Sequence, residues 1–113
     1  MASRQDFVDY VVDQLGDAGT ITYKKMFGEY GIYCNGKMIA LICDDQFFLK
    51  ITDAARMMYS DLPEVPPYEG AKNYFLIEDV DDREVLTKLT IATYEELPEP
   101  KKKTRKTENR KKR

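Results

Sequence analysis

The dipeptide Asn35-Gly36 lies between two apolar runs and narrows the folds open to this chain more than any other feature. Asn-Gly is a preferred pair for a two-residue hairpin turn, because both central residues of a type I′ turn need a positive φ. Asp44-Asp45 follows the second apolar run and predicts another tight turn of the same length. The sequence therefore predicts neighbouring antiparallel strands joined by two short turns.

Two-residue turns at both positions fix which residues face each other across the strands. The expected pairs are Tyr33 with Met38, Gly31 with Ala40, Ile42 with Phe47, and Ala40 with Leu49. One face is then wholly apolar and is where helices should pack; it carries Tyr33, Met38, Ala40, Ile42, Phe47, Leu49 and Ile51. The other face carries Ile32, Cys34, Lys37, Ile39, Leu41, Cys43, Phe48 and Lys50.

This second face is more apolar than a solvent-exposed face of an antiparallel sheet usually is. Its four large apolar side chains would form an exposed patch on a monomer; they are Ile32, Ile39, Leu41 and Phe48. Such patches usually mark an interface. We therefore expect the chain to associate with itself through this face, as a two-fold homodimer.

Helical and strand patterns account for most of the remaining residues up to position 100. Helices are expected from Ser3, as the capping residue, to Gly16, and at 53–59 and 81–98. Strands are expected at 20–27 and 73–77, with a bend at 28–31 and a proline-rich structured loop at 60–72. This order predicts a two-layer α+β domain, an antiparallel sheet with helices packed on one face.

The composition argues against catalysis. The 113 residues include no His and only two Ser, Ser3 and Ser60. A Ser-His-Asp triad, a Cys-His pair and every imidazole metal site are thereby excluded, and we expect a non-enzymatic protein without cofactor or metal. No run of about 18 apolar residues could span a bilayer, and the first residues do not resemble an export signal. We therefore expect no membrane partner and a cytoplasmic location.

Charge is distributed very unevenly along the chain. The net charge of −2 is the balance between −10 over residues 1–100 and +8 over residues 101–113. We expect the domain to end at Pro100, since no apolar side chain beyond it could offset the entropy of ordering a tail. The basic residues of this disordered tail are Lys101, Lys102, Lys103, Arg105, Lys106, Arg110, Lys111, Lys112 and Arg113. They should either solubilise the protein or make weak, non-specific contact with nucleic acid.

Three segments in order resemble the N-terminal domain of the TfoX/Sxy family. They are Met26-Phe27-Gly28-Glu29-Tyr30-Gly31-Ile32-Tyr33, the hairpin from Asn35 to Ile42, and Phe48-Leu49-Lys50. The family's signature loop falls on Met26, Phe27, Gly28, Tyr30 and Gly31, while Glu29 stands where the pattern usually has a second glycine. The later Pro67-Tyr68 loop, a strand at 74–76 and a closing helix fit the same pattern.

The resemblance implies a fold similar to secretion chaperones and a role in regulating natural-competence genes, with a transcription factor of the cyclic-AMP receptor type as partner. It also implies that full-length members carry a second, helical domain, which the basic tail replaces in this chain. The leading hypothesis is a small regulatory protein that acts through protein–protein contacts. The alternative is a dimeric chaperone-like or peptide-binding module without a role at DNA.

Other features have both a functional and a structural interpretation. Cys34 and Cys43 should lie about 20 Å apart at about 3.4 Å per strand residue, too far for a disulfide, and are interpreted as packed free thiols. The loop at 26–31 could bind an anion or a peptide through its backbone, but a tight bend is favoured. Tyr68 and Tyr74 could stack on bases, but packing onto the sheet is favoured because the surrounding charge is not positive.

Overall fold

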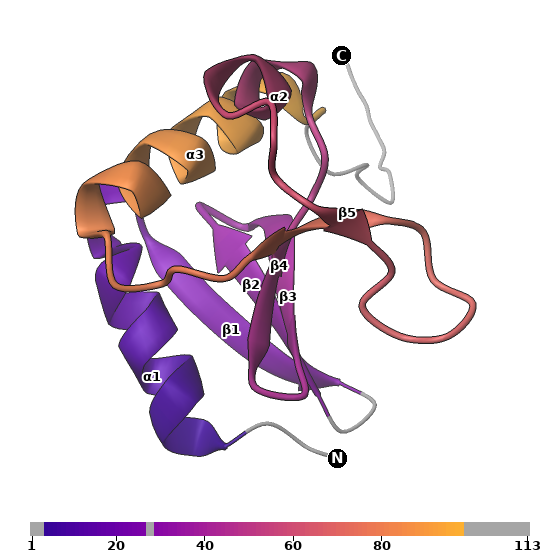
Figure 1. Ribbon diagram of the computed structural model, residues 1–113. Coiled ribbons are helices and arrows are strands. Elements are labelled where there is room, and N and C mark those ends of the chain that lie inside the picture. Colours follow the sequence, from indigo (N-terminus) through magenta and orange to yellow (C-terminus); the bar gives the residue numbers. More distant parts are fainter. Residues whose placement is uncertain (1–3, 27–28, 99–113) are drawn as a thin grey trace, which may run out of the picture.

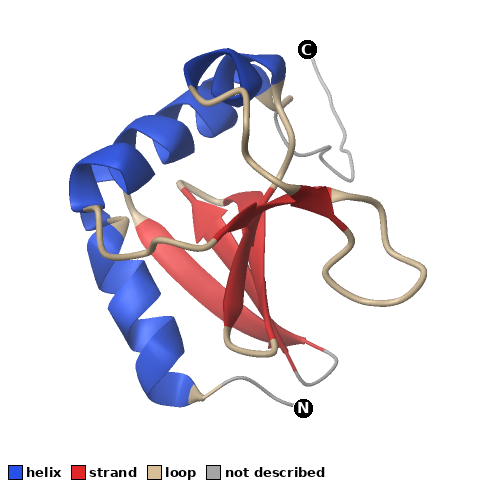
Figure 2. Ribbon diagram, viewed as in Figure 1, coloured by secondary structure: helices blue, strands red, loops and turns tan. Residues whose placement is uncertain are grey.

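The computed structural model describes residues 4–26 and 29–98. Six strands form one sheet in the order β1-β2-β3-β4-β6-β5, and every neighbouring pair is antiparallel. The strands are β1 (Ile21–Met26), β2 (Glu29–Cys34), β3 (Lys37–Cys43), β4 (Gln46–Leu49), β5 (Glu64–Val65) and β6 (Tyr74–Ile77). The helices are α1 (Gln5–Gln14), α2 (Asp53–Met58) and α3 (Arg83–Glu96), with a short 3-10 turn at Gly16–Ala18. Figures 1 and 2 show the helices gathered along one side of the sheet, which confirms the expected α+β fold.

Both tight turns have the predicted conformation. Asn35 and Gly36 have φ values of 51° and 85°, so both adopt the left-handed backbone that a type I′ turn needs. Asp44 and Asp45 have φ values of 54° and 57°. The register of the second hairpin, between β3 and β4, is the expected one.

Replacement of Gly36 by Val should lower the free energy of unfolding by about 1 to 3 kcal/mol. The added side chain meets no atom within 4 Å, so the cost comes from the positive φ, which β-branched residues strongly disfavour. Urea denaturation of the two proteins measures the difference. An unchanged midpoint would show that the turn does not need its left-handed backbone.

The first hairpin contains a β-bulge that the predicted register lacks. Beside the turn the pairing is as expected, but Ile32 pairs with Ala40 rather than with Ile39, which the bulge leaves unopposed. Gly31 consequently pairs with Leu41, and its expected pairing with Ala40 is wrong. Side chains alternate between the two faces of a strand. One inserted residue therefore reverses the predicted faces for β2 and for the part of β3 that lies between the turn and the bulge.

The main core lies between the sheet and the helices. Its large, fully buried side chains are Val8, Val11, Leu15, Ile32, Ile39, Ile42, Phe47, Leu49, Phe75, Leu86 and Leu89. Ile32, Cys34 and Ile39 belong to this core, so their predicted place on the second face is wrong. Met38, predicted on the helix face, packs with the apolar cluster of the other face. The bulge explains these exchanges.

The N-termini of two helices differ from the predictions. α1 begins at Gln5, with Arg4 as its N-cap residue, and Ser3 lies outside the described residues. In α2 the capping residue is Thr52 and not Asp53, because the Thr52 hydroxyl accepts a hydrogen bond from a main-chain N–H of the first turn. Each cap thus differs from the predicted residue by one position.

Two predicted irregular segments contain strand structure. The expected bend at 28–31 is wrong from Glu29 onward, where β2 has already begun. The proline-rich segment 60–72 includes β5, which pairs with β6 at the edge of the sheet. The sheet is therefore wider than the sequence pattern suggested.

A buried lysine connects the turn between β2 and β3 to the end of α3. Lys37 is only 6% exposed, and its Nζ donates hydrogen bonds to the main-chain carbonyls of Tyr94 and Leu97, at 2.8 and 2.6 Å. The same Nζ lies 4.2 Å from the centroid of the Tyr94 ring. A cation at this position satisfies carbonyls that the helix itself leaves without partners and complements the negative end of the helix dipole. The predicted place of Lys37 on the second face is therefore wrong.

Candidate functional site

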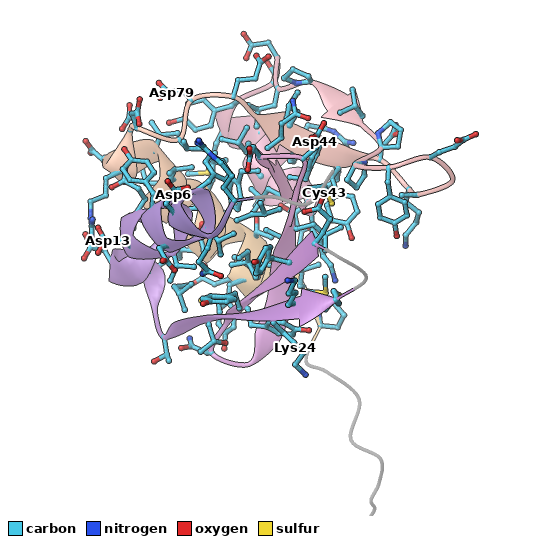
Figure 3. The ribbon with its side chains drawn as sticks, turned by 90° about the horizontal axis from the view of Figure 1, so that it is seen from below. Asp6, Asp13, Lys24, Cys43, Asp44 and Asp79 are labelled. Atoms are coloured by element: carbon cyan, nitrogen blue, oxygen red, sulfur yellow. The ribbon has the colours of Figure 1, made fainter. Side chains whose placement is uncertain are left out.

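An apolar cleft of about 500 Å³ lies on the face of the sheet opposite the helices. Its lining comes from four strands, from the turn at 44–45 and from the loop at 66–73, and consists of Met26, Glu29, Tyr30, Met38, Leu41, Cys43, Asp44, Pro67, Tyr68 and Tyr74. In Figure 1 the loop between β5 and β6 projects beyond the edge of the sheet. Figure 3 shows Cys43 and Asp44 on the side of that loop, away from Asp6 and Asp13 of α1.

A second, smaller apolar cluster shares four residues with the lining of the cleft: Met38, Leu41, Cys43 and Tyr74. Leu41, Cys43 and Phe48 are its buried members. Met38 and Tyr74, with Val65 and Leu76, pack against them. The cluster receives side chains from β3, β4, β5 and β6, so the second face is an ordered surface with its own packing.

The predicted patch on the second face does not exist in the form expected. Ile32 and Ile39 have no exposed surface and belong to the main core. Leu41 and Phe48 do lie on the second face, but they are 8% and 3% exposed within a single chain. The four side chains are therefore not an exposed interface of the monomer, and the surface that remains accessible there is the cleft beside them.

Gly31 has no side chain, and this leaves room for two methionine side chains at the cleft. A Cβ atom at this position would lie 2.9 Å from Met26 Cε and 3.3 Å from Met38 Cε. Its φ is not positive, so the room for these side chains, and not the backbone conformation, favours glycine here. Of the other signature residues, Tyr30 borders the cleft, but its ring belongs to the main core and its hydroxyl donates a hydrogen bond of 3.2 Å to Gln5 Oε1 of α1. Phe27 and Gly28 lie outside the described residues.

Two carboxylates stand at one rim of the cleft. Glu29 Oε2 accepts a hydrogen bond of 3.0 Å from the main-chain N–H of Asp44, so the start of β2 is held against the second hairpin turn. Cys43 belongs to the same lining. Burial, with smaller contributions from Glu29 and Asp44, raises the pKa of the Cys43 thiol to about 11. At neutral pH this thiol is protonated and a weak nucleophile.

The native protein should resist alkylation at Cys43. Both cysteines are free, and at pH 8 a thiol with a pKa near 11 presents about a hundredfold less thiolate than an ordinary one. Mass spectrometry after timed treatment with iodoacetamide, with the denatured protein as reference, measures the rate at each site. Reaction of native Cys43 at the denatured rate would contradict the burial described here.

The two tyrosines of the later loop and strand have different environments. Tyr74 packs on the second face, and burial raises its pKa, which confirms the packing interpretation for this residue. Tyr68 is 60% exposed and lines the open side of the cleft. Lys50 stands on the same face, where burial first and nearby Lys72 second lower its pKa.

The two cysteines do not share a face. Cys34 is in the main core, where burial raises its pKa, whereas Cys43 lines the cleft. Their prediction as packed free thiols is confirmed. The prediction that both cysteines lie on the second face is wrong, because the bulge in β3 lies between them.

The sequence did not indicate that Met38, Met26 and Pro67 would meet at one site. The one indication in the sequence was that the signature segment and the Pro67-Tyr68 loop both fit the pattern of the same family. The fold brings these two segments to one cleft. The basic residues of the predicted tail and the domain boundary at Pro100 lie outside the described residues.

Comparison with known proteins fits this geometry. Residues 13–97 match the TfoX N-terminal domain, and this match covers both hairpins, the strands of the cleft and all of α3. The chain belongs to the TfoX N-terminal domain family. A relative is the uncharacterized 12.7 kDa protein in the trpE 5′ region of Spirochaeta aurantia. It is 37% identical over 109 residues, which cover 95% of this chain and 94% of that protein.

The TfoX N-terminal domain match includes all the residues that line the cleft. The signature segment thus has a structural role in this TfoX N-terminal domain: it supplies Met26 to the lining, Gly31 to the space behind it, and the Tyr30 ring to the main core. Among the described residues, no helix is both long enough and apolar enough to cross a membrane.

Proposed function

We propose that this TfoX N-terminal domain protein is a non-enzymatic regulator that acts through protein–protein contacts in the transcription of competence-type genes. Its proposed partner is a transcription factor of the cyclic-AMP receptor type. The observation that carries the proposal is the apolar cleft on the face opposite the helices, in a chain of this family. Large concave apolar surfaces with few polar groups are typical of binding sites.

The groups around the cleft favour binding over chemistry. The chain has no His, and the thiol of Cys43 is protonated at neutral pH. Among the described residues, no group of three or more Cys, Asp or Glu side chains could hold a metal ion. Methionine side chains, in contrast, are flexible and polarizable and adapt to apolar partners. The lining therefore suits a contact surface.

The proposed partner can be tested by the electrophoretic mobility of promoter DNA with the purified transcription factor. Addition of this protein should produce a slower complex. Tyr68→Ser should weaken that complex, whereas Tyr10→Ser, which removes an exposed aromatic ring from α1, should not. An unchanged mobility at every concentration of the protein would overturn the proposal.

The basic tail is proposed to add weak contact with DNA that does not depend on sequence. Nine basic residues release counterions on binding, so the affinity should fall steeply with salt. The charge of −10 on residues 1–100 opposes the same contact. Mobility shifts at increasing salt should show weaker binding for a chain shortened to end at Pro100, and equal binding by both chains would contradict the proposal.

The same cleft supports a second candidate, a dimeric chaperone-like or peptide-binding module without a role at DNA. The homodimer stays a prediction, and because Ile32 and Ile39 lie in the core, a dimer formed through the second face would use the cleft and its rim. Light scattering at increasing concentration measures the molecular mass. A dimer that leaves the mobility of the transcription factor–DNA complex unchanged would favour this candidate over the first.

A further inference from the structure

The cleft is apolar inside and negatively charged at one rim. Met26, Met38 and Leu41 provide the apolar interior, while the carboxylates of Glu29 and Asp44 stand at the rim. None of the described lining residues is basic. An occupant that matches both parts combines an apolar side chain with a positive charge.

The open side of the cleft suits a chain rather than a small enclosed molecule. Tyr68 is 60% exposed and stands with Pro67 on a loop at the edge of the sheet, so the lining on this side faces solvent. A peptide backbone therefore has room to continue past the cleft on this side. Exposed aromatic rings beside an apolar pocket are also frequent anchors in protein interfaces.

The chain's own basic tail does not match the interior. Residues 101–113 contain no apolar side chain, so they could meet the carboxylates of the rim but leave the methionines uncovered. The occupant must bring apolar surface that this segment lacks.

We propose that the cleft binds an extended segment of a partner protein in which an aromatic or long aliphatic side chain stands next to a lysine or arginine. The apolar side chain lies between the methionines and Tyr68, and the cation lies at Glu29 and Asp44. This inference rests on the proposed function, because it names the chemistry of the partner at the same site.

The absence of tryptophan from the chain provides a direct probe. A blocked peptide of sequence Gly-Trp-Leu-Arg-Gly contains the only indole in the sample, and its emission should shift to shorter wavelength as the ring leaves water. Titration with the full-length protein yields the affinity. A second peptide with glutamate in place of arginine should bind at least about threefold more weakly, and the difference should shrink as salt is raised.

Variants of the protein locate the bound peptide. Tyr68→Ser should weaken binding about tenfold, since it removes an aromatic wall of the site. Glu29→Gln combined with Asp44→Asn should weaken it about three- to tenfold and abolish the preference for arginine over glutamate. Both replacements keep the shape of the side chain, and the amide oxygen of the new glutamine could still accept the hydrogen bond now made by Glu29. Asp45→Asn, in the same turn but outside the cleft, should bind like the wild type.

Several outcomes would overturn the inference. They are the absence of a shift with the arginine peptide at millimolar concentration, equal binding of the two peptides, and binding of blocked tryptophan alone as tightly as the arginine peptide. A concentration-dependent dimer that excludes the peptide would assign the cleft to a second copy of this chain and would also overturn it. If the peptide fails while the transcription factor–DNA complex still changes mobility, only this inference is lost. If the peptide binds and the mobility is unchanged, only the proposed partner is lost.

Discussion

Replacement of Lys37 by Met is expected to lower the free energy of unfolding by about 3 kcal/mol. The ammonium group is buried and donates to two main-chain carbonyls at the end of α3, and its loss leaves these acceptors without those donors. Hydrogen bonds to charged groups contribute roughly 1.5 to 3 kcal/mol each, and the contact with the Tyr94 ring adds to them. Met keeps most of the apolar stem, so the change isolates the charge. Urea denaturation measures the loss.

Lys88→Met is the matched control. Lys88 is exposed on α3 and forms an ion pair of 3.3 Å with Glu84 one turn before it. Such pairs contribute about 0.2 to 0.5 kcal/mol, so this variant should unfold almost like the wild type. Equal small losses for both variants would contradict the structural role assigned to Lys37.

Replacement of Gly31 by Leu is expected to abolish most binding in the cleft while the fold persists. The new side chain must occupy the space that Met26 Cε and Met38 Cε fill, and it pushes these flexible ends into the cleft. Overpacking of this kind costs about 1 to 3 kcal/mol of stability. The affinity for the tryptophan peptide should fall at least tenfold, because the volume that receives the indole is filled.

Gly16→Leu controls for the general effect of adding a large side chain in place of glycine. A Cβ at position 16 has Arg83 Nη2 as its nearest neighbour, at 3.7 Å, outside the cleft. This variant should bind the peptide with the wild-type affinity. Unchanged affinity in Gly31→Leu, with its fold confirmed by circular dichroism, would contradict the position of the site.

The sequence predicted the local features of this fold well because their causes are local. The turns at 35–36 and 44–45 follow from residues that tolerate positive φ, and α3 begins where Asp82 can cap it. The bulge at Ile39 could not be predicted, since no glycine or proline marks it. It depends on which residues fill the space beneath the helices, and that is decided by packing between distant segments.

The candidate site was harder to predict than the fold for the same reason. The signature segment indicated that Met26 and Gly31 matter, but not that they serve a cleft. That requires the loop at 66–73 to meet β2 and β3 across the sheet, through β4 and β6. From the sequence, Tyr68 was only an aromatic residue in a proline-rich loop. Its place in the cleft depends on neighbours from other strands, which the sequence does not identify.

If the face opposite the helices is the contact surface, the methionine methyl groups can report the contact within one molecule. Met26 and Met38 line the cleft, whereas Met57, 86% exposed, and Met58 lie on α2. Full-length protein with ¹³C-labelled methionine methyl groups can be titrated with the DNA-bound transcription factor and followed by NMR. We expect shifts at Met26 and Met38 and constant signals from Met57 and Met58. Shifts confined to the α2 methionines, or none at all, would contradict a contact surface at the cleft.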